Sequence, residues 1–175
     1  MTDPPLHVVV PGALDQRTGG YLYDANMVRE MRRRGRIVEV HEVPGRFPAA
    51  DAGSRSALDG ALRSVPDGRS VVVDGLALGG APDVAARHAD RLRIVGLVHH
   101  PLADETGLTP RRRADLEAQE RRALQAVRGA IVTSAFTGRR VGGMGVGPER
   151  IRVVRPGTEP GGVRPGSPPG ATAAP

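Results

Sequence analysis

Short apolar runs alternate with longer amphipathic stretches along most of this chain. Six runs rich in Val, Ile and Leu have the length of buried strands: 6–12, 36–43, 70–75, 93–100, 130–134 and 149–157. Between them, apolar residues recur at helical spacing in 19–35, around 57–62, and in 84–92, 110–129 and 135–141. Strands that are apolar on both faces and alternate with helices are typical of a parallel sheet covered by helices. The sequence therefore predicts an α/β fold with a doubly wound, mainly parallel, Rossmann-like sheet.

Local signals place several helix ends. Gly35 follows three arginines at the end of the first helix, which is typical of a C-cap with a basic last turn. Thr109 precedes Pro110, a pairing that favours a helix start with a side-chain cap. Ser134 is predicted to cap the helix that follows the fifth strand.

The chain changes character near residue 155. Residues 1–155 are predicted to form one domain, and 156–175 are rich in Gly and Pro with almost no apolar side chains. Such a segment cannot bury enough surface to fold, so it is interpreted as a disordered tail that resembles an interdomain linker.

Composition narrows the chemistry. The chain has no Cys, which excludes thiolate nucleophiles and Cys-ligated zinc. All 25 basic residues are Arg, which excludes a catalytic lysine. The net charge of +6 invites a nucleic-acid hypothesis, but aromatic residues for base stacking are nearly absent. No stretch has the length and apolarity of a membrane span, so a cytoplasmic protein, with possible peripheral contact at the inner membrane face, is expected.

The carboxyl ends of the strands are the expected place for a site in such a sheet. In the order 3-2-1-4-5-6, strands one and four are neighbours. Gly19 and Gly20 would then face His99 and His100 across a crevice. A Gly-Gly helix start can bind an anion through backbone N–H groups, and a histidine can donate or accept a hydrogen bond near pH 7. A flexible turn and a packing histidine pair are the plainer interpretations.

Other residues have weaker claims. No metal site is predicted, because adjacent histidines suit one ion poorly. Arg111, Arg112 and Arg113 lie in a first helical turn, where they oppose the helix dipole and either bind an anion or stay solvated. Glu120 falls on an apolar helix face, so a structural bond to a neighbouring loop is expected.

Three stretches together resemble the N-terminal, acceptor-side half of a family 4 glycosyltransferase with the GT-B fold: "GGYLYDANMVREMRRRGRIVEV", "IVGLVHHP" and "ERRALQAVRGAIVTSAFTGRRV", continued by "VGPERIRVVRPGTEP". The resemblance covers about residues 6–160. It implies that Gly19 and Gly20 contact the donor diphosphate and that His99 contacts the transferred sugar as the catalytic residue. It further implies acceptor-side positions, namely Tyr21, His100, Asp104 and Glu105.

The same resemblance implies a retaining, hexosyltransferase-type reaction with a nucleotide sugar as donor and a glycosyl acceptor, and no other cofactor or metal. The family's second, donor-binding domain has no counterpart in this sequence. The chain by itself is therefore expected to be inactive, or to need a separate chain that supplies this domain. Two alternatives stay open. One is a non-enzymatic binding module that keeps the cleft, and the other is an arginine-rich binder of nucleic acid or anionic membranes. In either case, binding to a specific nucleic-acid sequence is not expected.

Overall fold

The computed structural model describes residues 3–16 and 18–157 of the 175-residue chain. Its strands are β1 (Leu6–Pro11), β2 (Val38–Val43), β3 (Ser70–Asp74), β4 (Arg93–Val98), β5 (Gly129–Val132) and β6 (Ile151–Val153). Its α-helices are α1 (Gly19–Arg33), α2 (Ala52–Ser64), α3 (Gly75–Gly80), α4 (Pro82–His88), α5 (Pro110–Gln125) and α6 (Ala135–Gly143). Two short 3-10 helices, η1 (Leu102–Asp104) and η2 (Pro148–Arg150), complete the described elements.

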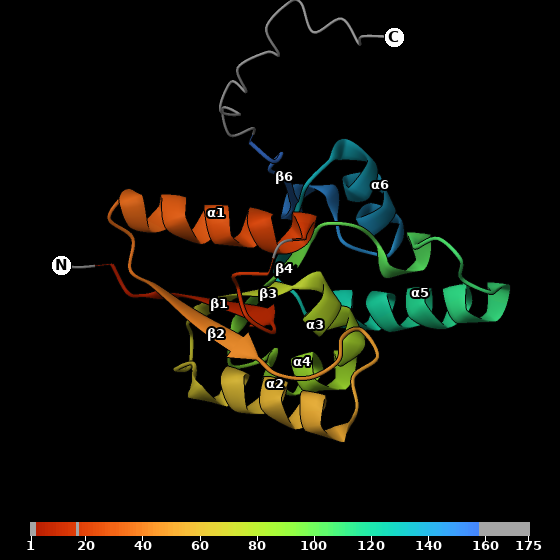
Figure 1. Ribbon diagram of the computed structural model, residues 1–175, viewed down its shortest axis with the longest axis horizontal. Coiled ribbons are helices and arrows are strands. Elements are labelled where there is room, and N and C mark those ends of the chain that lie inside the picture. Colours follow the sequence, from red (N-terminus) through yellow and green to blue (C-terminus); the bar gives the residue numbers. More distant parts are fainter. Residues whose placement is uncertain (1–2, 17, 158–175) are drawn as a thin grey trace, which may run out of the picture.

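The six strands form one parallel sheet in the order β2-β1-β3-β4-β5-β6. Helix α1 covers one face, and α2 and α4 cover the other (Figure 1). Alternate residues of each strand therefore enter different cores: Val8 and Val10 pack with Val28 of α1, whereas Val9 packs with Leu58 of α2. The predicted α/β, doubly wound fold is confirmed.

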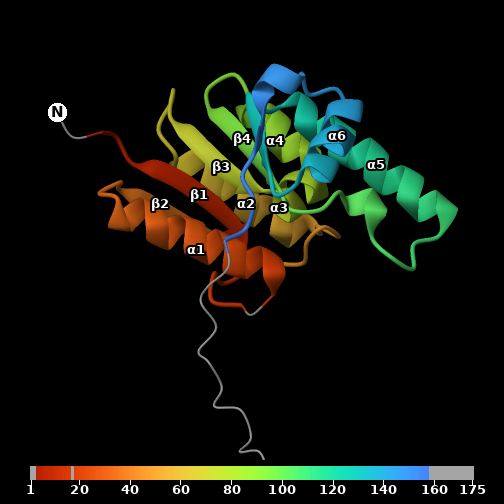
Figure 2. The same cartoon turned by 90° about the horizontal axis from the view of Figure 1, so that it is seen from above.

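The strand order differs from the prediction. β3 lies between β1 and β4, so strands one and four are not neighbours (Figure 2). From β1 the chain adds β2 on one side, and it then adds β3 to β6 on the other side. The topological switch point, where the strand order reverses, therefore lies between β1 and β3. Hydrophobic patterning identifies strands but does not say on which side of β1 the next one pairs, because pairing depends on contacts between segments that are distant in sequence.

Helix α3 was not predicted. Its sequence, GLALGG, is too short and too rich in Gly to show helical periodicity. The Asp74 carboxylate accepts a hydrogen bond from the backbone N–H of Leu76 at 2.8 Å and so caps the helix start. The capping signals predicted elsewhere are confirmed: Thr109 and Ser134 accept from the backbone N–H groups of Arg112 and Thr137.

The predicted tail falls almost wholly on residues 158–175, which lie outside the described residues, so that prediction stays open. No helix in the described part of the chain combines the length and the apolar character needed to cross a membrane.

Candidate functional site

Three polar side chains meet at the carboxyl edge of the sheet, beside the switch point. Asp74 is the last residue of β3, and His99 directly follows β4. Asp24 comes from the second turn of α1, on the same helix face as the buried Val28. Parallel strands end at one edge, and α1 begins at that edge, so three segments distant in sequence supply one cluster.

The ligand-type atoms of this cluster converge. Nε2 of His99 lies 3.0 Å from Oδ1 of Asp24 and 3.4 Å from Oδ2 of Asp74. All three atoms lie within 4.8 Å of one another. Both carboxylates are buried, with 1% and 5% of the side chains exposed for Asp24 and Asp74, while 20% of the His99 side chain reaches solvent. The cluster is therefore a nearly dry pair of carboxylates with an imidazole at its opening.

Two of these atoms lack a hydrogen bond. Nε2 of His99 and Oδ1 of Asp24 are buried, and neither has a hydrogen-bond partner among the described residues. The two atoms lie 3.0 Å apart, which is an ion-pair distance. Buried polar atoms without partners cost free energy, so their convergence on one point requires an explanation.

The electrostatics of the cluster follow from burial and charge. Burial lowers the pKa of His99, but the carboxylates of Asp24 and Asp74 more than offset this and raise the pKa to about 9. Burial also raises the pKa of the Asp24 carboxyl, the nearby imidazole opposes that rise, and Asp74 adds to it. Two buried carboxylates and one imidazole leave negative charge at this edge that a cation would compensate.

Helix α1 and two tyrosines surround the cluster. A Cβ on Gly20 would stand 3.3 Å from Cδ2 of His99, so the helix start and the imidazole are in contact. The ring of Tyr23 meets the His99 ring edge-on, with centroids 5.1 Å apart. The Tyr21 hydroxyl donates a hydrogen bond to the carbonyl of Pro11, at the end of β1. These contacts fix the imidazole between α1 and β4.

The geometry fits a metal ion. Ligand atoms bound at about 2.1 Å stand about 3.0 Å apart in an octahedron and about 3.4 Å apart in a tetrahedron. The two observed separations from Nε2, 3.0 and 3.4 Å, lie within this range. Oδ1 of Asp74 is already held by the N–H of Leu76, which leaves Oδ2 free to bind an ion.

The predicted pairing of the two loops is confirmed in geometry, since Gly20 lies against His99 and Gly19 is the first residue of α1. His100 is exposed and does not belong to the cluster. The predicted roles of these residues stay untested.

The remaining predicted positions are apart from the cluster. Asp104 accepts two hydrogen bonds from Arg140, at 2.7 and 2.9 Å, which tie η1 to α6. Glu105 is exposed. Glu120 accepts a hydrogen bond from the N–H of Leu102 at 3.0 Å, so the expected structural bond to a loop is confirmed. Arg113 donates to the carbonyl of Ala103, a local structural bond.

Sequence reasoning missed both aspartates. Asp74 ends an apolar run in the same way as His99, and two parallel strands that end in polar residues place them at one edge. Asp24 was missed because the apolar residues at helical spacing in 19–35, Leu22 among them, predict a buried face that does not include it. Leu22 is in fact 52% exposed, and the buried face runs through Asp24 and Val28.

A hollow between α2, α4 and α5 is separate from the site. It is lined by Arg55, Asp83 and Arg122 among others, and it includes none of the three cluster residues. Its lining is that of a solvated groove between charged helices, with Arg55 and Arg87 paired to Asp83.

Comparison with known proteins gives a limited result. No family model matches the sequence, and no curated protein matches it. Among solved structures, carboxyl esterase 2 from the mycorrhizal fungus Tuber melanosporum is similar, with a TM-score of 0.47 and 14% identity. The alignment covers 86% of this chain and 66% of the esterase chain. A likeness of this degree carries no argument about activity.

These findings correct the expectation drawn from the resemblance. The predicted membership of glycosyltransferase family 4, with its GT-B half-fold and sugar transfer, is withdrawn, because no family model and no curated protein matches the sequence. The binding-module and arginine-rich-binder alternatives gain no support either. The physical reason is that a helix starting in Gly-Gly and strands ending in polar residues occur in parallel α/β sheets of many functions, so their order reflects the fold and not the chemistry.

Proposed function

We propose that this protein is a metal-dependent enzyme, whose divalent ion is held by Asp24, Asp74 and His99 and whose substrate is a small phosphate ester. The observation that carries the proposal is the convergence of three buried ligand atoms, two of which have no hydrogen-bond partner among the described residues. A cation at their meeting point would bind both carboxylates and the imidazole at once and would supply the missing positive charge.

The donor set limits the choice of ion. Two carboxylate oxygens and one imidazole nitrogen suit Zn²⁺, Mn²⁺ or Mg²⁺, and these ions leave further coordination positions for water and substrate when only three protein ligands are present. When bound, such an ion lowers the pKa of a coordinated water and polarises a substrate oxygen. The partial exposure of His99 gives a substrate access to that position.

The start of α1 supports an anionic substrate. Thr18 precedes the helix without a side-chain cap hydrogen bond, so the first N–H groups of α1 are not capped by that residue. They belong to the turn that contacts His99 through Gly20. A phosphate group that binds these N–H groups would gain from the helix dipole and would stand beside the proposed ion.

The chemistry that these residues support is hydrolysis. The chain has neither Cys nor Lys to act as a nucleophile, so a covalent thiol or amine intermediate is excluded. The proposed reaction uses a water coordinated by the ion as the nucleophile; it forms one P–O bond and breaks another, with the proton passing to the leaving oxygen.

Metal binding is tested first. The full chain is treated with EDTA, dialysed, and melted with and without millimolar Mg²⁺ or Mn²⁺. An ion present at 100 times its Kd stabilises the fold by about 2.7 kcal/mol, which raises Tm by roughly 5–10 °C. Asp24→Asn and His99→Gln should abolish the rise, while His100→Gln, a neighbouring histidine outside the cluster, should keep it.

Catalysis is tested next, with a chromogenic phosphate monoester and each ion. Activity should depend on the ion, survive His100→Gln and disappear in Asp24→Asn. Ion binding without hydrolysis would refute the catalytic part alone. If no ion shifts Tm, the cluster is a permanent ion triad and the proposal is wrong.

A further inference from the structure

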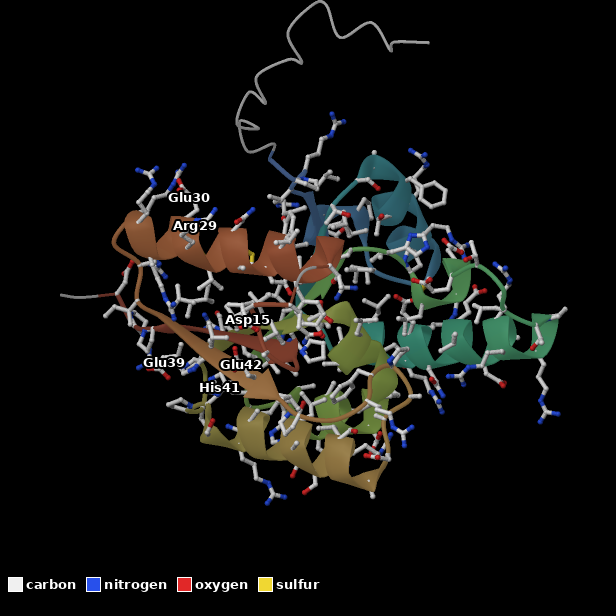
Figure 3. All side chains as sticks on the ribbon, viewed as in Figure 1. Asp15, Arg29, Glu30, Glu39, His41 and Glu42 are labelled. Atoms are coloured by element: carbon white, nitrogen blue, oxygen red, sulfur yellow. The ribbon has the colours of Figure 1, made fainter. Side chains whose placement is uncertain are left out.

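A second cluster of metal-ligand side chains lies on the β1–β2 pair, away from the carboxyl edge. His7 is the second residue of β1 and stands directly opposite Glu39 in the parallel register. His41 is two residues beyond Glu39, so it projects from the same face of β2. Figure 3 shows Glu39 and His41 along β2, the edge strand of the sheet.

The side chains of His41 and Glu39 both approach Nδ1 of His7. Nδ1 of His7 lies 3.1 Å from Nε2 of His41 and 3.3 Å from Oε2 of Glu39. All three ligand atoms lie within 4.8 Å of one another. As at the first cluster, these separations match the edges of a coordination polyhedron with bonds of about 2.1 Å.

One hydrogen bond joins His7 to His41, and its direction depends on which of the two nitrogens carries the proton. Nδ1 of His7 then has no proton to donate to the Glu39 carboxylate, which lies 3.3 Å away and is 53% exposed. Nε2 of His7 is buried without a partner among the described residues under either interpretation, so that atom does not discriminate. A cation would satisfy all three converging atoms together.

The three side chains differ in their exposure to solvent. The His7 side chain is 3% exposed and fixed within the sheet, whereas Glu39 is 53% exposed and His41 is half-buried. An ion can therefore enter from solvent at the sheet edge, and the two outer side chains can turn to complete the coordination.

We infer that His7, Glu39 and His41 form a binding site for a borderline transition-metal ion, with Zn²⁺, Ni²⁺ or Cu²⁺ favoured over Mg²⁺ or Ca²⁺. Two imidazole nitrogens and one carboxylate oxygen are the ligands that such ions prefer, while Mg²⁺ and Ca²⁺ prefer oxygen. The site differs in donor set and in place from the Asp24–Asp74–His99 cluster, and it does not depend on the proposed function.

The experiment isolates this site in the full chain. Asp24→Asn is introduced first to remove the carboxyl-edge cluster, and the EDTA-treated protein is titrated with ZnCl₂ by calorimetry. One equivalent of Zn²⁺ should bind. Adding His41→Gln or Glu39→Gln should weaken that affinity at least about 10-fold, because each removes a direct ligand. Adding His100→Gln, an exposed histidine outside both clusters, should change nothing. Circular dichroism confirms that each variant is folded.

Electron paramagnetic resonance with Cu²⁺ gives a second readout. In the Asp24→Asn chain, coupling to two nitrogens is expected, and it should fall to one nitrogen in the chain that also carries His41→Gln. Equal Zn²⁺ affinity with and without His41→Gln, or no binding at all, would overturn the inference. Failure here leaves the Mg²⁺ and Mn²⁺ response of the carboxyl-edge cluster intact, so the two proposals are tested separately.

Discussion

Replacing Glu120 by Gln should stabilise this protein at pH 8 and leave its stability nearly unchanged at pH 4.5. Glu120 lies on α5 and is 3% exposed. Its carboxylate accepts one hydrogen bond, from the N–H of Leu102 at 3.0 Å. Burial raises its pKa from 4.5 to about 7; that hydrogen bond opposes the rise, and Asp104 adds to it.

The sign and size of this stability difference follow from the linkage between proton binding and folding. Between pH 4.5 and 7 the folded chain holds a proton on Glu120 that the unfolded chain releases, so stability falls as the pH rises through this window. The pKa difference corresponds to about 3 kcal/mol of unfolding free energy, fully lost above pH 7. Gln carries no charge at any pH and keeps an oxygen for the Leu102 N–H, so the variant should escape this loss.

Urea denaturation at pH 4.5 and pH 8 measures the effect. The wild-type protein should lose about 3 kcal/mol relative to Glu120→Gln between the two pH values, which corresponds to roughly 6–12 °C in Tm. Glu117→Gln, on the same helix but 37% exposed at the side chain, is the matched control and should behave as wild type. A Glu120→Gln variant less stable than wild type at pH 8 would refute the reasoning, since the charged carboxylate would then be a net stabilising group.

Three further substitutions test the packing around the site. Gly20→Val should abolish the ion-dependent rise in Tm while the fold persists by circular dichroism, because a Cβ at this position already meets the His99 ring at 3.3 Å; an unchanged rise would contradict the contact. Asp104→Asn should cost about 1–2 kcal/mol in urea denaturation, because it breaks the bidentate pair with Arg140; no loss would mean the pair is fully screened. Gly96→Ala should destabilise by about 1–3 kcal/mol in the same assay, because its methyl group would stand 2.9 Å from a leucine side chain of α3. A neutral result would show that this leucine can move aside.

Local signals predicted most of the secondary structure because each depends on neighbouring residues alone. Thr109 with Pro110, and Ser134, cap helices through bonds that span three residues, so the sequence contains both partners. Helix α3 escaped prediction because its stability comes from burial and from the Asp74 cap, and its six residues show no period of their own.

The candidate site was half predicted for a similar reason. His99 was found because it ends an apolar strand, and its contact with Gly20 is confirmed. Asp24 was missed because a helix has several plausible buried faces, and only the position of the sheet selects the one that contains it.

The sequence by itself determined the alternation of strands and helices, the parallel α/β class and the absence of Cys and Lys chemistry, since these follow from local periodicity and composition. Only the tertiary structure decided that β3 lies between β1 and β4, and so that Asp74 stands beside His99. The six strands can pair in several orders at similar local energy. The choice among them depends on long-range packing, which no short segment contains.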